Sequence, residues 1–259
     1  MSRGLGDVYK RQGPLDAESL KCHGGPHLLL WIESNGPRRH RRETPPLPQP
    51  VPAASPRHAN MSISLADRPD LRARMRDRRR ALTPRQSALA SVAISERLLR
   101  LPAFRRARSV AAYWPIDGEV DVREVLLTAH ARGSATLLPV LDRRRQGVMR
   151  FVPWRPGLPL VRNRYGIPEP AAATRRFQPA LSIDLVIAPL VAFDDDGHRL
   201  GLGGGYYDRA FSSVTQHRRP WSRLVGVAYE HQRVNGLEAA PWDVTLSDVV
   251  TERQHYRCR

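Results

Sequence analysis

The sequence predicts an α/β layered fold with a mostly parallel sheet. The first observation behind this prediction is that strand-like and helix-like segments alternate along residues 109–251. The strand-like segments are short, apolar and rich in branched residues, as buried strands are. The second observation is a dense glycine run at residues 201–205, between a predicted strand and a predicted helix. Because ligands bind at the carboxyl ends of the strands in such sheets, the fold also predicts where a site lies.

The first 60 residues are expected to lie outside this fold. They contain a basic run at residues 38–42 and a proline-rich stretch at 45–50, and neither sustains the period of a helix or strand. The chain's only lysines, Lys10 and Lys21, lie here, and Met61 follows directly. We interpret residues 1–60 as a disordered, non-native leader and residues 61–259 as the folded domain. A natural tail on a basic protein is the alternative.

Two helices are predicted at the start of the folded part. Asp67 can cap the first, and apolar Leu71 and Met75 recur at helical spacing. A second helix is predicted from a cap at Thr83 to about residue 101. A row of arginines falls beside the apolar stripe of the first helix, namely Arg68, Arg72, Arg76 and Arg79. Such a row is usually a solvated face, although it could also clamp the oxygens of a triphosphate.

The remaining elements alternate along the chain. Strands are expected at residues 109–114, 135–140, 149–152, 183–188, 223–228 and 244–251, and helices at 122–132 and 206–214. The stretch between the strands at 149–152 and 183–188 is expected to be largely irregular. Residues 115–121 and the glycine run then lie at the carboxyl edge of the sheet.

The glycine run is the least ordinary part of the sequence. Glycine loses more conformational entropy than other residues when it is ordered, so a dense cluster indicates positive φ angles or close backbone contacts. A phosphate held by backbone amides at a helix start is one explanation, and a plain tight turn is the other. The familiar nucleotide-binding fingerprints do not match, because no Gly-Lys-Ser/Thr is present and Tyr206 replaces the last glycine of a dinucleotide loop.

Three carboxylates follow the predicted strand at 109–114. Asp117 and Gly118 suit a turn, and Asp121 suits a helix cap. Glu119 is left unexplained, and at the end of a strand it could accept hydrogen bonds from the N–H groups of a heteroaromatic ring. Trp114 could pack against that ring or belong to the core.

Asp208 is the predicted metal ligand. It follows the glycine run closely, and Mg²⁺ is usually held by one or two carboxylates together with substrate phosphates. The alternative is an acid that is simply favoured at the start of a helix. The acidic run at residues 194–196 suits a solvated turn better, because consecutive side chains point in different directions.

The formal net charge of +17 favours anionic partners. The arginines are spread along the chain without a DNA or RNA recognition motif, so small polyanions explain the charge as well as a nucleic acid does. Cys22 and Cys258 are isolated, which implies neither a disulfide framework nor a metal cluster and fits a cytoplasmic protein. No segment reaches the ~18 apolar residues of a membrane span.

Together these segments resemble the 5-formyltetrahydrofolate cyclo-ligase family, also called methenyltetrahydrofolate synthetases, from about residue 67 to residue 252. The most specific part is residues 199–209, which are similar to the family's arginine-leucine-glycine, glycine-rich, tyrosine-tyrosine-aspartate signature. Residues 118–121, 165–170, 184–189 with 193–194, and 243–252 support it. The resemblance implies a three-layer αβα fold and a ligase that uses ATP and Mg²⁺, and we expect a monomer. Its reaction converts 5-formyltetrahydrofolate to 5,10-methenyltetrahydrofolate, with release of ADP and phosphate.

The resemblance also implies roles for individual residues. The expected ATP contacts are Arg68, Arg72, Gly201, Leu202, Gly203, Gly204, Gly205, Tyr206 and Tyr207. The expected folate contacts are Trp114, Glu119, Gly203, Gly204 and Tyr206. The expected metal ligand is Asp208, and the expected catalytic residues are Arg199, Tyr206 and Tyr207.

The chain departs from the family pattern near its end. A second magnesium-associated aspartate is often found there, and its position falls on Ser247. Asp248 is one residue late and would face the opposite side of a strand. Either a bulge restores Asp248, or magnesium relies on Asp208, phosphates and water.

Two other functions stay open at this stage. A sugar-phosphate isomerase or CoA-transferase-like enzyme has a similar layout but does not need ATP. A basic nucleic-acid-binding module would bind in a salt-sensitive manner. We expect small-molecule partners, a reduced folate and ATP, and neither a nucleic acid nor a membrane.

Overall fold

The computed structural model describes residues 62–142, 145, 147–171, 177–212 and 222–258. All of them belong to one compact unit. The predicted leader at residues 1–60 lies outside the described residues, as does the end of the predicted helix at 206–214. Within the described ranges, no helix has the length and apolar character needed to cross a membrane.

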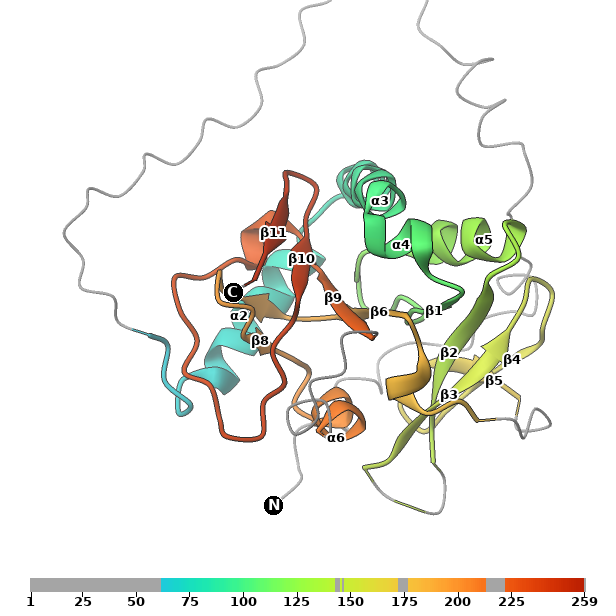
Figure 1. Ribbon diagram of the computed structural model, residues 1–259. Helices are drawn as coiled ribbons and strands as arrows, with labels where there is room; N and C mark the ends of the chain where they lie inside the picture. Colours follow the sequence, from blue (N-terminus) through green and yellow to red (C-terminus); the bar gives the residue numbers. More distant parts are fainter. Residues whose placement is uncertain (1–61, 143–144, 146, 172–176, 213–221, 259) are drawn as a thin grey trace, which may run out of the picture. The chain divides into compact units, whose positions relative to one another are not determined.

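A seven-stranded sheet forms the centre of the fold, in the order β11-β10-β9-β6-β1-β2-β3 (Figure 1). The strands are β1 (Ser109–Ala111), β2 (Ala135–Leu141), β3 (Met149–Trp154), β6 (Leu185–Pro189), β9 (Arg223–Val227), β10 (Asp248–Val250) and β11 (His255–Arg257). Neighbouring strands from β10 to β2 are parallel, and β11 and β3 are antiparallel edge strands. The predicted α/β fold with a mostly parallel sheet is therefore confirmed.

The described helices are α2 (Arg68–Arg80), α3 (Pro84–Arg100), α4 (Pro102–Arg106), α5 (Arg123–Ala131) and α6 (Tyr206–Phe211), with 3₁₀ turns η2 (Ala180–Ser182) and η3 (Glu230–Gln232). In Figure 1, α3, α4 and α5 lie on one side of the sheet and α6 lies on the other. The predicted N-terminal helical pair corresponds to α2 and α3.

The starts of these two helices differ in how they are capped. Thr83 caps α3 through a capping box, in which Thr83 Oγ1 accepts from the Gln86 amide and Gln86 Oε1 accepts from the Thr83 amide. Asp67 occupies the N-cap of α2 as predicted, but its side chain makes no capping bond. Instead, Asp67 accepts a 2.7 Å hydrogen bond from the Ser64 hydroxyl.

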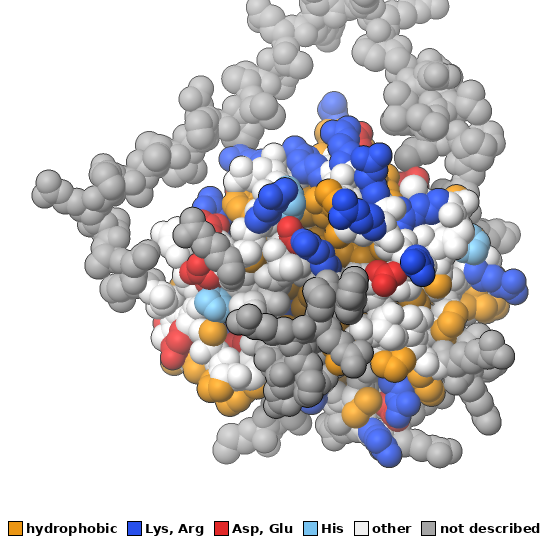
Figure 2. Space-filling model, viewed as in Figure 1, with side chains coloured by type: hydrophobic (Ala, Val, Ile, Leu, Met, Phe, Trp, Pro, Cys, Tyr) orange, Lys and Arg blue, Asp and Glu red, His pale blue; other side chains and the backbone are white. Residues whose placement is uncertain are grey.

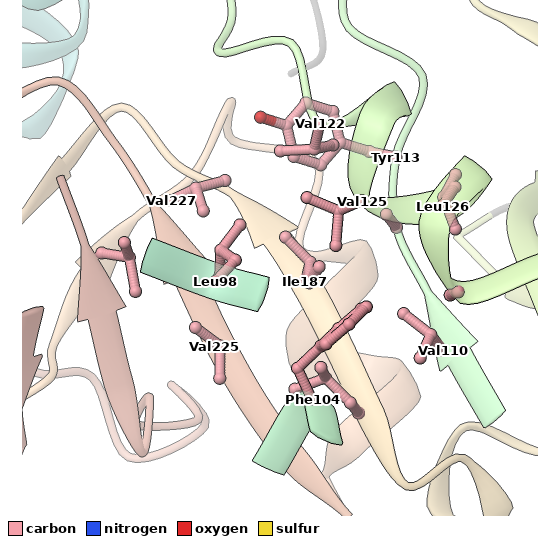
Figure 3. Close-up of a cluster of buried hydrophobic side chains, with 14 of the residues drawn as sticks. Leu98, Phe104, Val110, Tyr113, Val122, Val125, Leu126, Ile187, Val225 and Val227 are labelled. Carbon is pink, nitrogen blue, oxygen red and sulfur yellow. The ribbon is translucent and has the colours of Figure 1, made fainter. Parts of the chain in front are cut away.

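The two faces of the sheet are buried in two separate hydrophobic clusters. Successive residues of a strand point to opposite faces, so Ile187 joins the cluster under α3, α4 and α5 while Val186 joins the cluster that contains Phe211 of α6. Figure 3 shows the first cluster, in which Leu98 and Phe104 lie against the strand residues. Helices therefore cover both faces of the sheet, and the fold has three layers.

Two small sheets were not predicted from the sequence. The hairpin of β4 (Leu160–Arg162) and β5 (Pro168–Pro170) lies in the stretch expected to be irregular. The hairpin of β7 (Ala192–Phe193) and β8 (Arg199–Leu200) separates β6 from the glycine run. Helix α2 packs on this second hairpin through a third apolar cluster that includes Leu71, Met75 and Leu200. The glycine run therefore follows a short hairpin, not the central strand itself.

Many basic side chains on the face of the molecule seen in Figure 2 belong to helices and not to the central sheet. Figure 2 shows basic side chains gathered near the top of the view, over the region of α3 and α4. The last turns of these helices carry Arg97, Arg100, Arg105 and Arg106. Cations at the C-terminal end of a helix interact favourably with the helix dipole, which gives part of the charge a structural role.

We expect Leu98→Ala to lower the free energy of unfolding by about 3 kcal/mol, because it removes a fully buried side chain from the first cluster and leaves a cavity. Leu89→Ala is the matched control, since Leu89 lies on the same helix and is 61% exposed. Its effect should stay within about 0.5 kcal/mol. Urea unfolding monitored by circular dichroism measures both values, and similar losses in the two variants would contradict the described packing of α3.

Candidate active site

A cavity of about 250 Å³ lies at the carboxyl edge of the sheet. Its wall includes residues that directly follow β1 and β6, among them Tyr113 and Leu190. Every residue for which the sequence predicted an ATP, folate, metal or catalytic contact lines this cavity. The prediction that the site lies at this edge agrees with the geometry, because the glycine run and the segment after β1 meet there.

The glycine run is shaped by backbone requirements. Gly203 has a φ of 98° and Gly205 a φ of 62°, in the region that side chains disfavour. A Cβ atom on Gly204 would lie 2.7 Å from the ring of Tyr206, which is too close. Helix α6 then begins but has only six residues. Backbone amides of the loop, and not the dipole of a long helix, are therefore what this segment can offer an anion.

Two arginines of α2, Arg68 and Arg72, line the cavity together with the glycine run. The Arg72 Nε donates to the carbonyl of Gly201 at 2.9 Å. Arg68 donates to the carbonyl of Glu238 and to Asp243 Oδ2, both at 2.6 Å. Burial and the neighbouring charge of Arg68 lower the pKa of Arg72. An anion placed between the two guanidinium groups would relieve this repulsion, so this part of the cavity suits a phosphate.

The remaining arginines of the predicted row, Arg76 and Arg79, have a different role, which they share with Arg80. Arg76, Arg79 and Arg80 converge on the carboxylate of Asp117, with their nearest nitrogens at 3.2, 3.1 and 2.8 Å. The prediction of a solvated face is wrong here, because the Arg79 side chain is only 2% exposed. The triphosphate alternative is not supported for Arg76 or Arg79 either, since among the described residues neither belongs to the cavity wall.

Asp117 forms the predicted turn with Gly118. Both residues have positive φ angles, 50° and 73°. Burial by itself would raise the pKa of Asp117, but the Arg80 hydrogen bond and the charges of Arg79, Arg80 and Arg76 lower it. The turn is thus held by electrostatic contacts with α2 as well as by its own backbone. Nearby, Asp121 accepts from the amide of Arg123, the first residue of α5.

Glu119 is a buried acid in the wall of the cavity, with 9% of its surface exposed. Its Oε2 accepts a 3.1 Å hydrogen bond from the Ile116 amide. Burial raises the pKa of Glu119 to about 7, even though the charge of Arg79 lowers it. Burial raises the pKa values of Tyr113 and Tyr207, and the charge of Glu119 raises both further by a smaller amount. Glu119 therefore exchanges its proton near neutral pH, while the two phenols keep theirs.

The sequence left two roles open for Trp114, packing in the core and contact with a ligand ring, and its position is compatible with both. It packs edge-on against Trp154 with ring centroids 6.2 Å apart, and it also lines the cavity. Elsewhere in the wall, the hydroxyl of Tyr206 accepts from Arg164 at 3.2 Å and lies 3.1 Å from the hydroxyl of Tyr165. Neither Arg164 nor Tyr165 was singled out as a site residue, because no pattern joins them to the glycine run.

Asp208 and Arg199 form an ion pair inside the cavity wall. Asp208 Oδ1 accepts from Arg199 at 2.5 Å and from the Val244 amide at 3.3 Å. Arg199 is buried and also donates to the Val244 carbonyl. These contacts fix the carboxylate of Asp208 at the cavity, and both of them use the same oxygen.

The acidic run at 194–196 forms a turn, as predicted, with Gly197 at a φ of 87°. Asp194, however, is buried and is not solvated as expected. Its oxygens accept from the amides of Asp196, His198 and Leu237. Asp194, Asp196 and His198 bring their ligand atoms within 4.8 Å of one another, but these hydrogen bonds explain the buried carboxylate without a metal.

Comparison with known proteins identifies the family. The profile of the 5-formyltetrahydrofolate cyclo-ligase family matches residues 64–252. The chain belongs to this family. A 5-formyltetrahydrofolate cyclo-ligase of Escherichia coli K12 is 38% identical over 177 residues, which cover 68% of this chain and 96% of the relative. The corresponding protein of Haemophilus influenzae is 32% identical over 71% of this chain and 96% of its own length.

Solved structures agree with this assignment. The NMR structure of Aquifex aeolicus 5,10-methenyltetrahydrofolate synthetase matches with a TM-score of 0.63 at 29% identity, over 74% of this chain and 93% of that one. A synthetase from Mycoplasma pneumoniae shares the fold, with a TM-score of 0.57 at 24% identity. As a cyclo-ligase family member the chain is an enzyme, a ligase that acts on a folate, and the resemblance seen in the sequence is confirmed. The roles of the individual cavity residues stay predictions.

The departure from the family pattern at Ser247 gains a structural explanation. Neither Ser247 nor Asp248 belongs to the cavity wall: the Ser247 hydroxyl donates to the Leu224 carbonyl, and buried Asp248 pairs with Arg223 and His255. Asp243 is the carboxylate from the last part of the chain that lines the cavity, and the sequence analysis missed it. β10 begins only at Asp248, so the strand expected from residue 244 starts later in the structure.

We expect Asp117→Asn to lower the free energy of unfolding by about 2 kcal/mol at neutral pH, because it leaves a cluster of guanidinium groups without their shared charge. Asparagine keeps the size of the side chain and tolerates positive φ. Because folding lowers the pKa of Asp117, its contribution is complete above the ordinary pKa of an aspartate and is lost as the pH falls through the lowered value.

The control is Asp77→Asn, since the Asp77 side chain is 76% exposed and 3.7 Å from Arg80. Its effect should stay within about 0.5 kcal/mol. Urea unfolding of both variants at several pH values gives the comparison. Equal stabilities at neutral pH would show that the Asp117 contacts do not hold the turn.

Proposed function

We propose that the chain catalyses the ATP- and Mg²⁺-dependent cyclisation of 5-formyltetrahydrofolate to 5,10-methenyltetrahydrofolate, with release of ADP and phosphate. The observation that carries this proposal is that one cavity brings together two chemically different sets of residues. The first set is the glycine run with the guanidinium groups of Arg68 and Arg72, and the second is buried Glu119 with Trp114. Membership of the cyclo-ligase family supports a reduced folate as the substrate.

The glycine run with Arg68 and Arg72 suits the triphosphate of ATP. Residues 201–205 offer backbone amides without side chains in the way, and Arg72 and Arg68 supply positive charge. Charge-assisted hydrogen bonds from guanidinium groups to phosphate are among the strong ones in proteins. In this proposal Tyr206 and Tyr207 border both substrates, and Tyr207 can donate a hydrogen bond because burial keeps its phenol protonated.

Glu119 and Trp114 suit the pterin ring of the folate. A carboxylate is an acceptor only, and the ring carries N–H donors, so ionised Glu119 can hold it in one orientation. The indole of Trp114, in the wall of the same cavity, offers a flat apolar surface. We assign these two residues to the folate on this basis.

The residues near Asp208 fit a magnesium ion. Asp208 uses Oδ1 for its described hydrogen bonds, which leaves Oδ2 for a cation, and Asp243 lines the same cavity. Mg²⁺ prefers one or two carboxylates combined with phosphate oxygens, which matches acids beside a phosphate loop. When bound, the ion would offset the negative charge that the triphosphate brings. The ion pair with Arg199 keeps Asp208 in place for this purpose.

The reaction then depends mainly on placing two substrates together. The formyl oxygen takes the γ-phosphoryl group of ATP, N10 attacks the activated formyl carbon, and phosphate leaves. Arg68 and Arg72 neutralise charge on the phosphates, and Glu119 orients the ring. Arg199, predicted to be catalytic, acts through Asp208, because its described contacts are with Asp208 and Val244.

The decisive test is an assay of the purified full chain with ATP, Mg²⁺ and 5-formyltetrahydrofolate. We expect the ultraviolet absorbance of the methenyl product to appear only when ATP is present. A family enzyme run in parallel controls the assay, and absence of product from this chain alone would refute the proposal. The same assay on a chain that begins at Met61 tests whether residues 61–259 form the catalytic domain.

We expect Asp208→Asn to lower turnover by at least about tenfold and to raise the Mg²⁺ concentration needed for half-maximal rate, since a neutral amide is a poor magnesium ligand. Asp196→Asn is the control, because Asp196 is exposed and is not among the described residues of the cavity wall. Magnesium titrations of the initial rate, with melting temperatures to verify folding, give the result. Unchanged magnesium dependence in Asp208→Asn would remove this residue from the metal site.

A further inference from the structure

We propose that Arg79 is a positioning residue for the part of the cavity assigned to the folate, which acts from behind the wall by fixing the turn at Asp117 and by pairing with Glu119. This inference rests on the proposed function, in which Glu119 accepts hydrogen bonds from the pterin ring. Arg79 itself does not line the cavity within the described part of the chain. Its effect on the substrate therefore passes through Glu119.

The contacts of Arg79 span the whole turn. Its Nε donates to the Asp117 carbonyl at 2.8 Å, and its Nη2 donates to Asp117 Oδ2 at 3.1 Å. Its Nη1 lies 3.9 Å from Glu119 Oε1. Between these residues, a Cβ atom on Gly118 would stand 3.6 Å from the Arg79 Cγ. One buried side chain thus contacts both Asp117 and Glu119, the residues on either side of Gly118.

Arg79 is also the principal positive charge that acts on Glu119. The charged and titratable groups facing Glu119 are Arg79 and Arg76 from α2, Asp117 from its own turn, Tyr113 after β1 and Tyr207 from α6. Asp117 opposes ionisation of Glu119, and burial opposes it more strongly. Arg79 counters both, ahead of the Ile116 amide and Arg76, so its removal leaves a buried acid that keeps its proton at neutral pH.

The structure provides a matched pair of variants. Arg79 and Arg80 both donate to the Asp117 carboxylate, at 3.1 and 2.8 Å, but only Arg79 forms a described ion pair with Glu119. Arg79→Met and Arg80→Met therefore both remove a partner of Asp117, and only the first removes the counter-charge of Glu119. If Arg79 only stabilised the turn, Arg79→Met and Arg80→Met would have the same effect on the titration of Glu119.

The first measurement follows the Glu119 carboxyl directly, by NMR of protein carrying ¹³C in its glutamate side-chain carboxyls. Glu119→Gln identifies the resonance by its disappearance. The titration midpoint is expected near pH 7 in the unmodified chain and in Arg80→Met. In Arg79→Met it should rise by about 1–3 pH units, the usual effect of losing a close opposite charge.

The second measurement is equilibrium binding of 5-formyltetrahydrofolate between pH 6 and pH 9, roughly the range over which the two midpoints are expected. At pH near 7, Arg79→Met should bind about tenfold more weakly than Arg80→Met, and its affinity should recover as the pH rises. The KM for ATP should not differ between the two variants. In Glu119→Gln, combined with either change, the pH dependence should disappear.

Two further variants keep the test decisive if Arg79→Met does not fold. Arg79→Gln retains an N–H donor but no charge, and it should show the same upward shift of the midpoint. Arg79→Lys restores the charge and should return the midpoint toward that of the unmodified chain. Equal midpoints in the uncharged Arg79 variants and Arg80→Met, or a full shift in Arg79→Lys, would overturn the inference. Absence of folate binding by the unmodified chain would refute the proposed function instead, because the carboxyl titration requires no ligand.

Discussion

The arrangement of the site depends on helix α2, whose arginines bind three separate loops. Along α2, Arg68 binds the segment that carries Asp243, Arg72 binds the glycine run, and three further arginines bind the turn at Asp117. These loops belong to distant parts of the sequence and have few regular contacts of their own. Since residues three and four apart share one face of a helix, a single row of guanidinium groups can reach all of them. The cavity exists because this row fixes the surrounding loops to one rigid element.

The central layers of the fold could be predicted because their signals are local. Branched apolar runs such as residues 183–188 and the capping pattern at Thr83 determine strands and helices over short distances, and both predictions were confirmed. The missed hairpins have strands of two or three residues, which are too short to show a period of two. Their pairing depends on contacts with α2 and the main sheet, which no local pattern encodes.

The sequence analysis predicted which residues lie together at the cavity better than it predicted their electrostatic contacts. The glycine run, Glu119 and Asp208 carry recognisable chemistry, and they share one cavity. The sequence could not show that Arg79 is buried, because a row of arginines looks the same whether it faces water or a carboxylate 38 positions further along the chain. Asp243 was missed because its place at the cavity depends on a contact with distant Arg68, which no local pattern shows.

The ion pair between Arg68 and Asp243 joins residues that are 175 positions apart in the chain. Contacts of such long range are slow to form, because a large loop must close before they contribute any stability. During synthesis, the first helix is therefore made long before its last partner is available. The wall of the cavity is complete only when the segment around Asp243 is docked on α2. A ligand that binds there consequently stabilises the two ends of the folded unit together, and not one local segment.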